Sequence, residues 1–345
     1  MNYKITIGIP AYNASEYIKR TLGSVLNQSF NSIQVLIVDD CSTDNTCNII
    51  SEIQINHPKG GNIKLLIQKQ NQGVSAARNR IIKEAEGEYL YFMDSDDTIE
   101  PNTISLLYDK IQEHKADIAF ASYRKLMTDK NGNETIENNI YPDIFFNDNT
   151  SFGMYAFRKM GGIQSAPVNY LVKLSKLRDN HLKFIKANYW EDATFVMEMA
   201  TYMDRVVLCH NITYNYICRE NSLSHYQARN MIPKSEIEGN MYVVECMKSN
   251  AYKAITKKYG ADINFVALSF AFYTICGILG KRNIIKPKIS FSEMISIIHS
   301  QITFKDIMAM KRRKCFHVLF WTLSKFPAFI TIPIIWSMGK VKHVI

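Results

Sequence analysis

The chain has 345 residues, 47% of them hydrophobic, and a formal net charge of +9 at pH 7. This apolar content is enough to bury one large or two ordinary cores, and it excludes a disordered chain. The seven cysteines are odd in number and form no Cys-x-x-Cys pair, which argues against zinc and disulfides and favours reduced thiols in a cytoplasm. The N-terminal residues contain no charged leader followed by a long apolar segment, so we expect no signal peptide.

The positive charge is concentrated in the last third of the chain. Residues 231–345 carry 17 Lys and Arg against 6 Asp and Glu, a balance of +11, whereas the first 230 residues carry 24 against 26, a balance of −2. This asymmetry predicts that the C-terminal part faces an anionic surface, either membrane or nucleic acid, while the N-terminal part has a different task.

Four apolar segments near the N-terminus have the length and composition of buried strands, and a helical pattern follows each of them. Ser15 is the expected N-cap of the first helix, and Pro101 the expected first residue of the fourth. Four strand-then-helix units in succession predict an α/β fold with a parallel, doubly wound sheet. The strands are expected at residues 4–9, 33–38, 63–67 and 89–93, and the helices at residues 15–28, 44–53, 71–86 and 101–114.

The fourth strand runs directly into three carboxylates, Asp94, Asp96 and Asp97. Like charges this close raise one another's pKa, and a hard divalent cation such as Mg²⁺ or Mn²⁺ relieves the repulsion while leaving positions for phosphate oxygens. The alternative is a solvated turn whose Asp and Ser side chains cap the next helix. The neighbouring motifs favour the metal interpretation.

Three polar segments follow strands directly: residues 10–13, the pair Asp39-Asp40, and residues 94–97. Ligands of such sheets bind in the crevice at the carboxyl ends of the strands, so we expect all three segments to line one crevice. Neither Gly-x-Gly-x-x-Gly nor Gly-x-x-x-x-Gly-Lys-Ser/Thr occurs, so a dinucleotide fold and a P-loop are not supported. The phosphates of a ligand would then be held through a metal.

The ordered motifs PAYN, LIVDDCSTDNT, NQGVSAARN and YLYFMDSDD resemble the family 2 glycosyltransferases, which have the GT-A fold. The resemblance implies a nucleotide-diphosphate sugar donor, most often a UDP-sugar, and a Mn²⁺ or Mg²⁺ ion on Asp94 and Asp96. Its implied nucleotide-sugar-binding residues are Pro10, Tyr12, Asn13, Glu16, Asp40, Arg78, Asp94 and Ser95.

Each of these residues also has an ordinary structural interpretation. Tyr12 would pack at a strand end, Asp40 would cap a helix, and Arg78 would pair with Glu84 or Glu86 on the surface. The functional interpretation rests on their joint occurrence at strand ends that the fold brings together.

The middle of the chain carries fewer motifs. Residues 116–123 read as a strand, residues 123–141 as a hairpin with the turn Asn131-Gly132, and residues 151–160 as a helix that Gly161-Gly162 ends. We expect acceptor-side elements in this part of the chain.

The pair Glu191-Asp192 opens an amphipathic run over residues 193–203. Acids at a helix N-terminus are favourable dipole chemistry in any protein. The resemblance implies instead that Asp192 is the general base of an inverting transfer, with Glu191 beside it. Trp190 stacks on an acceptor sugar or is an ordinary half-buried aromatic, and Asp97 is a second acceptor candidate.

A further strand is expected at residues 206–217, and the segment after it resembles the loop that closes over the diphosphate in the family. Arg219 and His225 are the candidates there, and a surface position is the alternative for His225. The resemblance covers roughly residues 4–226.

The C-terminal part is helical in pattern, over residues 231–259 and 262–279. The basic tetrad at 311–314 then precedes an apolar stretch interrupted by Lys325, Pro327 and Pro333, which disfavours one straight transmembrane helix. An interfacial segment on anionic lipid fits this composition. A helical pair buried on the catalytic domain or in a dimer is the alternative, and no recognition fold for nucleic acid accompanies the tetrad.

Together these observations predict a GT-A catalytic domain at residues 1–230, with a nucleotide-sugar half at 1–115 and an acceptor half at 116–230, and a helical basic region at 231–345. The expected function is metal-dependent inverting glycosyl transfer to a growing, lipid-linked glycan in capsule, exopolysaccharide or lipopolysaccharide synthesis, on the cytoplasmic face of the membrane. The alternatives are a nucleotidyltransferase, which normally carries a Gly-rich basic loop after its first strand, and a non-catalytic sugar-nucleotide-binding or assembly subunit.

Overall fold

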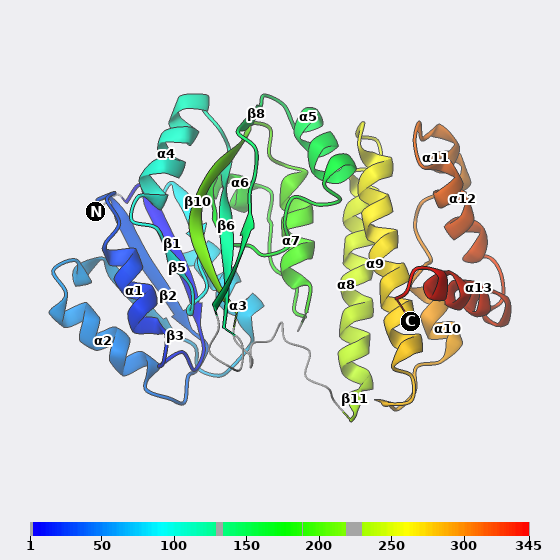
Figure 1. Cartoon of the computed structure of the whole chain (residues 1–345), viewed down its shortest axis with the longest axis horizontal. Coiled ribbons are helices and arrows are strands. Elements are labelled where there is room, and N and C mark those ends of the chain that lie inside the picture. Colours follow the sequence, from blue (N-terminus) through cyan, green and yellow to red (C-terminus); the bar gives the residue numbers. More distant parts are fainter. Residues whose placement is uncertain (1–2, 129–133, 188, 219–229, 345) are drawn as a thin grey trace. The chain divides into compact units, whose positions relative to one another are not determined.

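A computed structural model describes residues 3–128, 134–187, 189–218 and 230–344 (Figure 1). The chain divides into two compact units. The division differs from a single boundary at residue 230, because two earlier segments belong to the second unit. The first unit comprises residues 1–152, 166–186 and 202–226, and the second comprises residues 153–165, 187–201 and 227–345.

The first unit is built on a mixed sheet whose strand order is β3-β2-β1-β4-β9-β6-β10-β5, with β7 beside β6 and β8 beside β10. β3, β2, β1 and β4 are parallel, as predicted, and β9 enters antiparallel between β4 and β6. The strands described are β1 (Ile5–Ala11), β2 (Ile33–Asp39), β3 (Ile63–Ile67), β4 (Tyr89–Phe92), β5 (Thr98–Ile99), β6 (Ile118–Thr128), β7 (Glu134–Asn139), β8 (Ile144–Phe146), β9 (Tyr170–Lys173) and β10 (Val206–Cys218).

The four predicted N-terminal helices are present, and each starts two or three residues later than expected. Ser15 does not cap the first helix, because its amide donates to Asp44 and the helix begins at Ile18. Pro101 precedes the fourth helix instead of opening it. The helices that begin in this unit are α1 (Ile18–Leu26), α2 (Thr46–Asn56), η1 (Gly60–Asn62), α3 (Val74–Glu84), α4 (Thr103–His114), α5 (Asn149–Gly153) and α6 (Leu174–Asp179).

Close packing of α3 against β1 depends on Gly8. A Cβ atom at this position would lie 2.3 Å from Cγ2 of Ile81, which is completely buried. Any side chain at residue 8 would therefore push α3 off the sheet. Because α3 carries Arg78, Gly8 also determines how deep that guanidinium sits.

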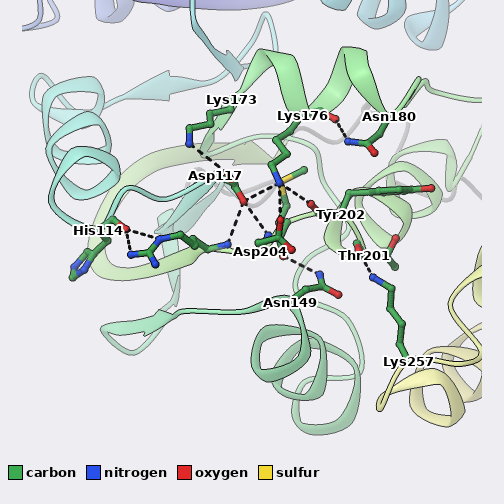
Figure 2. Close-up of polar contacts among 12 residues, drawn as sticks. His114, Asp117, Asn149, Lys173, Lys176, Asn180, Thr201, Tyr202, Asp204 and Lys257 are labelled. Atoms are coloured by element: carbon green, nitrogen blue, oxygen red, sulfur yellow. Dashed lines mark hydrogen bonds and ion pairs between the residues drawn. The ribbon is translucent and has the colours of Figure 1, made fainter.

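Asp117, at the start of β6, is the centre of a polar cluster in the first unit (Figure 2). Its Oδ2 accepts hydrogen bonds from the amides of Asp204 (3.0 Å) and Arg205 (3.2 Å), just before β10. Lys173 at the end of β9 and Lys176 on α6 form ion pairs with it at 3.4 and 3.2 Å. Burial alone would raise the pKa of Asp117, but these amides and the Lys176 ammonium lower it. The carboxylate thus ties β6, β9 and β10 together.

The second unit is helical. The long helices α8 and α9 run side by side (Figure 1), and their apolar faces form a core with the later helices. Its described elements are η2 (Met154–Lys159, a π-helix), α7 (Glu191–Ala200), β11 (Ile232–Pro233), α8 (Lys234–Lys253), α9 (Gly260–Gly280), β12 (Ile285–Lys286), α10 (Phe291–Ser296), α11 (Phe304–Ala309), α12 (Lys314–Leu323) and α13 (Ala328–Val341).

Asp262, at the start of α9, is completely buried and pairs with three arginines. Arg158 of η2 approaches it at 2.9 Å, and Arg313 and Arg312 at 3.0 and 3.8 Å. The guanidinium of Arg313 also lies 3.8 Å from the ring centroid of Phe265. Both arginines of the basic tetrad therefore pair with a buried carboxylate, although the side chain of Arg312 remains 51% exposed.

Among the described residues, α9 is the one helix long and apolar enough to cross a membrane, and 56% of its most apolar window is buried inside the protein. The apolar stretch after the tetrad is divided between α12 and α13, with Pro327 directly before α13. The prediction that this stretch is not one straight helix is confirmed.

Candidate functional site

The predicted strand-end segments of the first unit meet at one edge of the sheet. β1 pairs with β2 up to Ala11 opposite Asp39, and with β4 up to Gly8 opposite Phe92. Pro10 lies in β1 opposite Val38 of β2, beyond the point where β1 pairs with β4. Proline has no N–H to donate, and at this position β4 offers no acceptor that would need one. Residues 10–13, 39–40 and 94–97 thus leave the same edge, as the sequence predicted.

The loops after β1 and β2 are bonded to each other. Oδ1 of Asn13 accepts from the amide of Thr43 (2.8 Å), and the amide of Asn13 donates to Oγ of Ser42 (2.9 Å). Ser42 is held in turn by Asp39. Tyr12 stands on this braced turn with 49% of its surface exposed, which contradicts the alternative that it only packs at a strand end. Glu16 is also exposed.

Asp40 is buried and organises the segment before α3. Its Oδ1 accepts from the side-chain amide of Gln68 and the backbone amide of Gln72, and its Oδ2 accepts from the amide of Gly73 at 2.7 Å. Gly73 has φ +87°, a conformation that favours glycine. The cap expected of Asp40 on the second helix is absent, because that helix begins at Thr46 after the N-cap Asn45.

Arg78 and Asp94 form an ion pair at 3.1 Å. The guanidinium is 7% exposed and packs 5.4 Å from the ring centroid of Phe184, whereas the carboxylate is 29% exposed. Arg78 therefore belongs to the strand-end cluster, and the surface pairing with Glu84 or Glu86 is wrong. Phe184 itself is fixed by two hydrogen bonds between its backbone and the Asn79 side chain.

The backbone of residues 95–97 is held by α1. Nη2 of Arg20 donates to the carbonyl of Asp96 at 2.9 Å, and Oγ1 of Thr21 lies 2.9 Å from the carbonyls of Ser95 and Asp97. The side chains of Asp94, Ser95 and Asp96 are half-buried. These contacts fix two neighbouring carboxylates on a rigid turn.

Asp97 points into the protein. It is 1% exposed, Oδ2 accepts from the hydroxyl of Tyr214 at 2.6 Å, and Oδ1 accepts from the amide of Ile217 at 2.8 Å. Burial, and after it the charge of Asp94, raises the pKa of Asp97 to about 7. Tyr214 also accepts from the amide of Asp94 at 3.3 Å. Sequence reasoning missed Tyr214, because one aromatic in an apolar strand looks like any core residue.

The acid pair lies in the second unit, in the first turn of α7, as predicted. Glu191 is buried and Asp192 is half-buried, so Asp192 is the more accessible of the two. Trp190 precedes them in the left-handed conformation (φ 65°), 42% exposed, with its ring edge-on to Phe270 at 5.3 Å. Thr194 holds this turn through hydrogen bonds to the Trp190 carbonyl.

A cavity of about 140 Å³ lies against α7 within the second unit. The loop of Gly161 and Gly162, both with positive φ, forms part of its wall, as do Gln164 and Ser165. The remaining lining is apolar: Phe157, Ile163, Ala193, Val196, Met197, Ala200, Met247, Val266 and Phe270.

Some of the sequence candidates lie outside the described residues, namely Arg219, His225 and the Asn131-Gly132 turn. The strands on both sides of that turn pair antiparallel, so the predicted hairpin is present. In the described part of the chain, no cluster of three or more His, Cys, Asp or Glu side chains is arranged to hold a metal.

Residues 6–165 match the sequence profile of Glycosyl transferase family 2. Glycosyltransferase GlyA of Streptococcus pneumoniae is 30% identical over 226 residues, which are 64% of this chain and 31% of GlyA. Chondroitin synthase of Escherichia coli is 39% identical over 32% of this chain and 15% of its own length. The glycosyltransferase TuaG of Bacillus subtilis, described as a teichuronic acid biosynthesis protein, is 32% identical over 37% of this chain and 50% of its own.

The fold also has solved counterparts. The structure of S. aureus TarS residues 1–349 in complex with UDP-GlcNAc covers 99% of this chain and 92% of that one, with a TM-score of 0.69 at 21% identity. At that identity the likeness is one of fold, and it confirms the predicted α/β architecture with helices around a mostly parallel sheet. The sequence matches and the fold therefore agree with the resemblance of the motifs to the family 2 glycosyltransferases, and the match to that family's profile spans residues 6–165.

Proposed function

We propose that the chain transfers a sugar from a UDP-sugar to a hydroxyl group of a growing, lipid-linked glycan in bacterial surface polysaccharide synthesis. The observation that carries the proposal is the convergence of three strand ends at one braced edge, where Arg78 and Asp94 pair beside Asp96. The names of the relatives, which include glycosyltransferases and a chondroitin synthase, support transfer to a polysaccharide. A TarS structure with bound UDP-GlcNAc supports the choice of donor.

The nucleoside is assigned to the loops after β1 and β2. The exposed ring of Tyr12 offers a face on which a base or ribose can stack. Oδ2 of Asp40 has a second lone pair beyond the one used by Gly73, and it is assigned to the N–H group of uracil. Pro10, Asn13 and Glu16 shape the same turn. Because Asp40 also holds the segment before α3, base binding and the position of α3 are coupled.

The donor's diphosphate is assigned to Arg78 and to a divalent cation on Asp94 and Asp96. Carboxylate oxygens are the ligands that Mg²⁺ and Mn²⁺ prefer, and both side chains are half-buried on a turn that α1 holds rigid. Two protein carboxylates leave the remaining ligand positions for phosphate oxygens and water. An ion held there would supply positive charge to stabilise the leaving diphosphate.

Asp192 is assigned as the general base. It takes the proton from the acceptor hydroxyl while that oxygen forms a bond to the anomeric carbon, and the bond from this carbon to the diphosphate oxygen breaks with its electron pair on the diphosphate. One carboxylate base and a direct displacement predict inversion at the anomeric carbon. Glu191 is assigned to position Asp192, and Trp190 to the acceptor sugar. Asp97 is assigned to hold β10 against the turn.

The test is calorimetry of the full chain with UDP, with and without Mn²⁺, before any acceptor is known. We expect UDP to bind with Mn²⁺, to weaken strongly in EDTA and to be lost in Asp96→Ala. Asp192→Asn and the matched surface control Asp109→Asn on α4 should bind UDP as the wild type does. Failure of UDP, GDP and their sugars to bind would favour a non-catalytic assembly subunit instead.

A further inference from the structure

Helix α13 presents two contrasting faces. Ile332, Ile335 and Gly339 are buried on one face, where the helix packs on α9 and α10. The other face carries large apolar side chains in the solvent, among them Phe329 at 74% exposed and Trp336 at 47%. Such residues are normally buried, so an exposed set on one helix face indicates an interaction surface.

The exposed face includes a shallow groove along α13. It is lined almost entirely by apolar atoms, from Pro333, Ile334, Ser337, Met338, Val341 and Lys342. Phe326 and Ile330 are exposed on the same helix and the turn before it. We call Phe326, Phe329, Ile330, Ile334, Trp336 and Val341 the apolar face.

Lysines border the apolar face, and two of them lie over its aromatic neighbours. Nζ of Lys340 lies 5.3 Å from the ring centroid of Trp336, and Nζ of Lys325 lies 5.5 Å from that of Trp321. Lys342 is exposed and lines the groove, with its Nζ 6.0 Å from the ring centroid of Phe272 on α9. Residues 311–345 contain seven Lys and Arg and no Asp or Glu. The segment that carries the apolar face therefore contributes positive charge only.

We infer that the apolar face docks on an anionic phospholipid surface, with Phe329 and Trp336 at the boundary of headgroups and acyl chains and the three lysines on lipid phosphates. Aromatic and aliphatic side chains between lysines are typical of helices that lie in this boundary. The tetrad at 311–314 contributes less than the sequence suggested, because Arg312 and Arg313 already pair with Asp262.

The positive charge of the lysines favours an anionic phospholipid surface over a second copy of the chain. Two copies that met through the apolar face would bring their lysines together without any acid from the same segment, and like charges at such a contact oppose association. Lipid phosphates neutralise the lysines instead. Each lysine near an anionic surface adds about fivefold to the partition coefficient, so the three together account for about 100-fold.

The experiment is vesicle flotation of the full chain on phosphatidylcholine with and without phosphatidylglycerol. We expect binding to the anionic vesicles that falls as salt is raised. The variant Lys325→Gln/Lys340→Gln/Lys342→Gln should lose about 100-fold of that binding. The charge-matched control Lys83→Gln/Lys115→Gln/Lys183→Gln, on exposed lysines of the first unit, should bind nearly as well as the wild type.

The apolar contribution is tested separately. Phe329→Ser/Trp336→Ser should abolish flotation, whereas Ile55→Ser, which replaces an equally exposed residue on α2, should not. All four variants replace exposed side chains, so their thermal melting should match that of the wild type. Equal flotation of the lysine variant and its control would overturn the proposal. So would self-association of the wild type that Phe329→Ser/Trp336→Ser abolishes, because the face would then belong to a second copy.

Discussion

Asp117 and Asp94 belong to the same unit, but they differ in solvent exposure and in the number of their bonding partners. Asp117 is 8% exposed at its side chain, and two amides and two lysines surround its carboxylate. Asp94 is 29% exposed, and the carboxylate meets Arg78 through one oxygen. A carboxylate enclosed by donors from three elements stabilises the fold. A carboxylate at an open strand end, held by one guanidinium, keeps lone pairs for a ligand. On this difference we base the expectation that Asp117 is structural and that Asp94 binds a ligand.

The largest effect is expected at the proposed base. Asp192→Asn should lower kcat by about 10²- to 10⁴-fold, because the acceptor hydroxyl loses its proton acceptor. Donor affinity and thermal melting should stay close to the wild type. The measurement is turnover of a UDP-sugar in the presence of membrane extract as the source of acceptor, together with donor calorimetry. A kcat for Asp192→Asn equal to that of the wild type would contradict the role of Asp192 as general base.

Asp117→Asn should destabilise the first unit by about 3 kcal/mol, because Lys173 and Lys176 lose a buried partner and only one acceptor oxygen remains. Urea unfolding followed by fluorescence measures this loss. The folded fraction of the variant should still bind UDP with the affinity of the wild type. Weakened UDP binding by fully folded protein would show that Asp117 is not purely structural.

Asp94→Asn is the counterpart of that variant. Its side chain is partly exposed, and asparagine keeps an acceptor oxygen for the buried guanidinium of Arg78, so we expect a change in unfolding free energy of about 1 kcal/mol. The affinity for UDP with Mn²⁺ should fall by about 10- to 100-fold. Unfolding and calorimetry on the same preparation distinguish the two effects. A stability loss as large as that of Asp117→Asn would contradict the hypothesis that Asp94 binds a ligand and contributes little to folding.

The smallest effect is a pH dependence. The pKa of Asp117 is lowered in the folded protein, so its stabilisation is fully present above the unfolded pKa of about 3.9 and is lost as the pH falls through the folded value. The difference in unfolding free energy between wild type and Asp117→Asn should therefore shrink on acidification below about pH 4. Unfolding curves between neutral pH and the acid limit test this, and a difference that grows in acid would contradict it.

The sequence predicted the parallel strands, the helices between them and the strand-end cluster, because these depend on local periodicity and on the rule that parallel strands share an edge. It did not predict that β9 enters between β4 and β6, since strand pairing between distant segments leaves no local pattern. Helix starts were missed for a related reason. The sequence around Ser15 is typical of a helix cap, but its amide donates to Asp44 of another loop and the helix begins at Ile18.

The sequence could not predict which side chains pair with one another in the site, because the partners lie on different elements. Arg78 was found, but its partner Asp94 lies on a different element, and nearby glutamates were equally plausible from sequence. The hydroxyl of Tyr214 and the burial of Asp97 depend on β10 reaching the turn after β4. The ion pairs of Arg312 and Arg313 were not predicted, because their partner Asp262 lies 51 residues before Arg313.

The cluster around Asp262 also sets an order of events during synthesis. Arg158 leaves the ribosome 104 residues before Asp262, and Arg313 follows 51 residues after it. The full set of ion pairs to Asp262 can therefore form only after Arg312 and Arg313 have emerged. A chain shortened after Met310 would lose two of these three ion-pair partners of the buried Asp262. Truncations meant to remove α12 and α13 should therefore retain Arg313, so that loss of a function is not confused with loss of the unit.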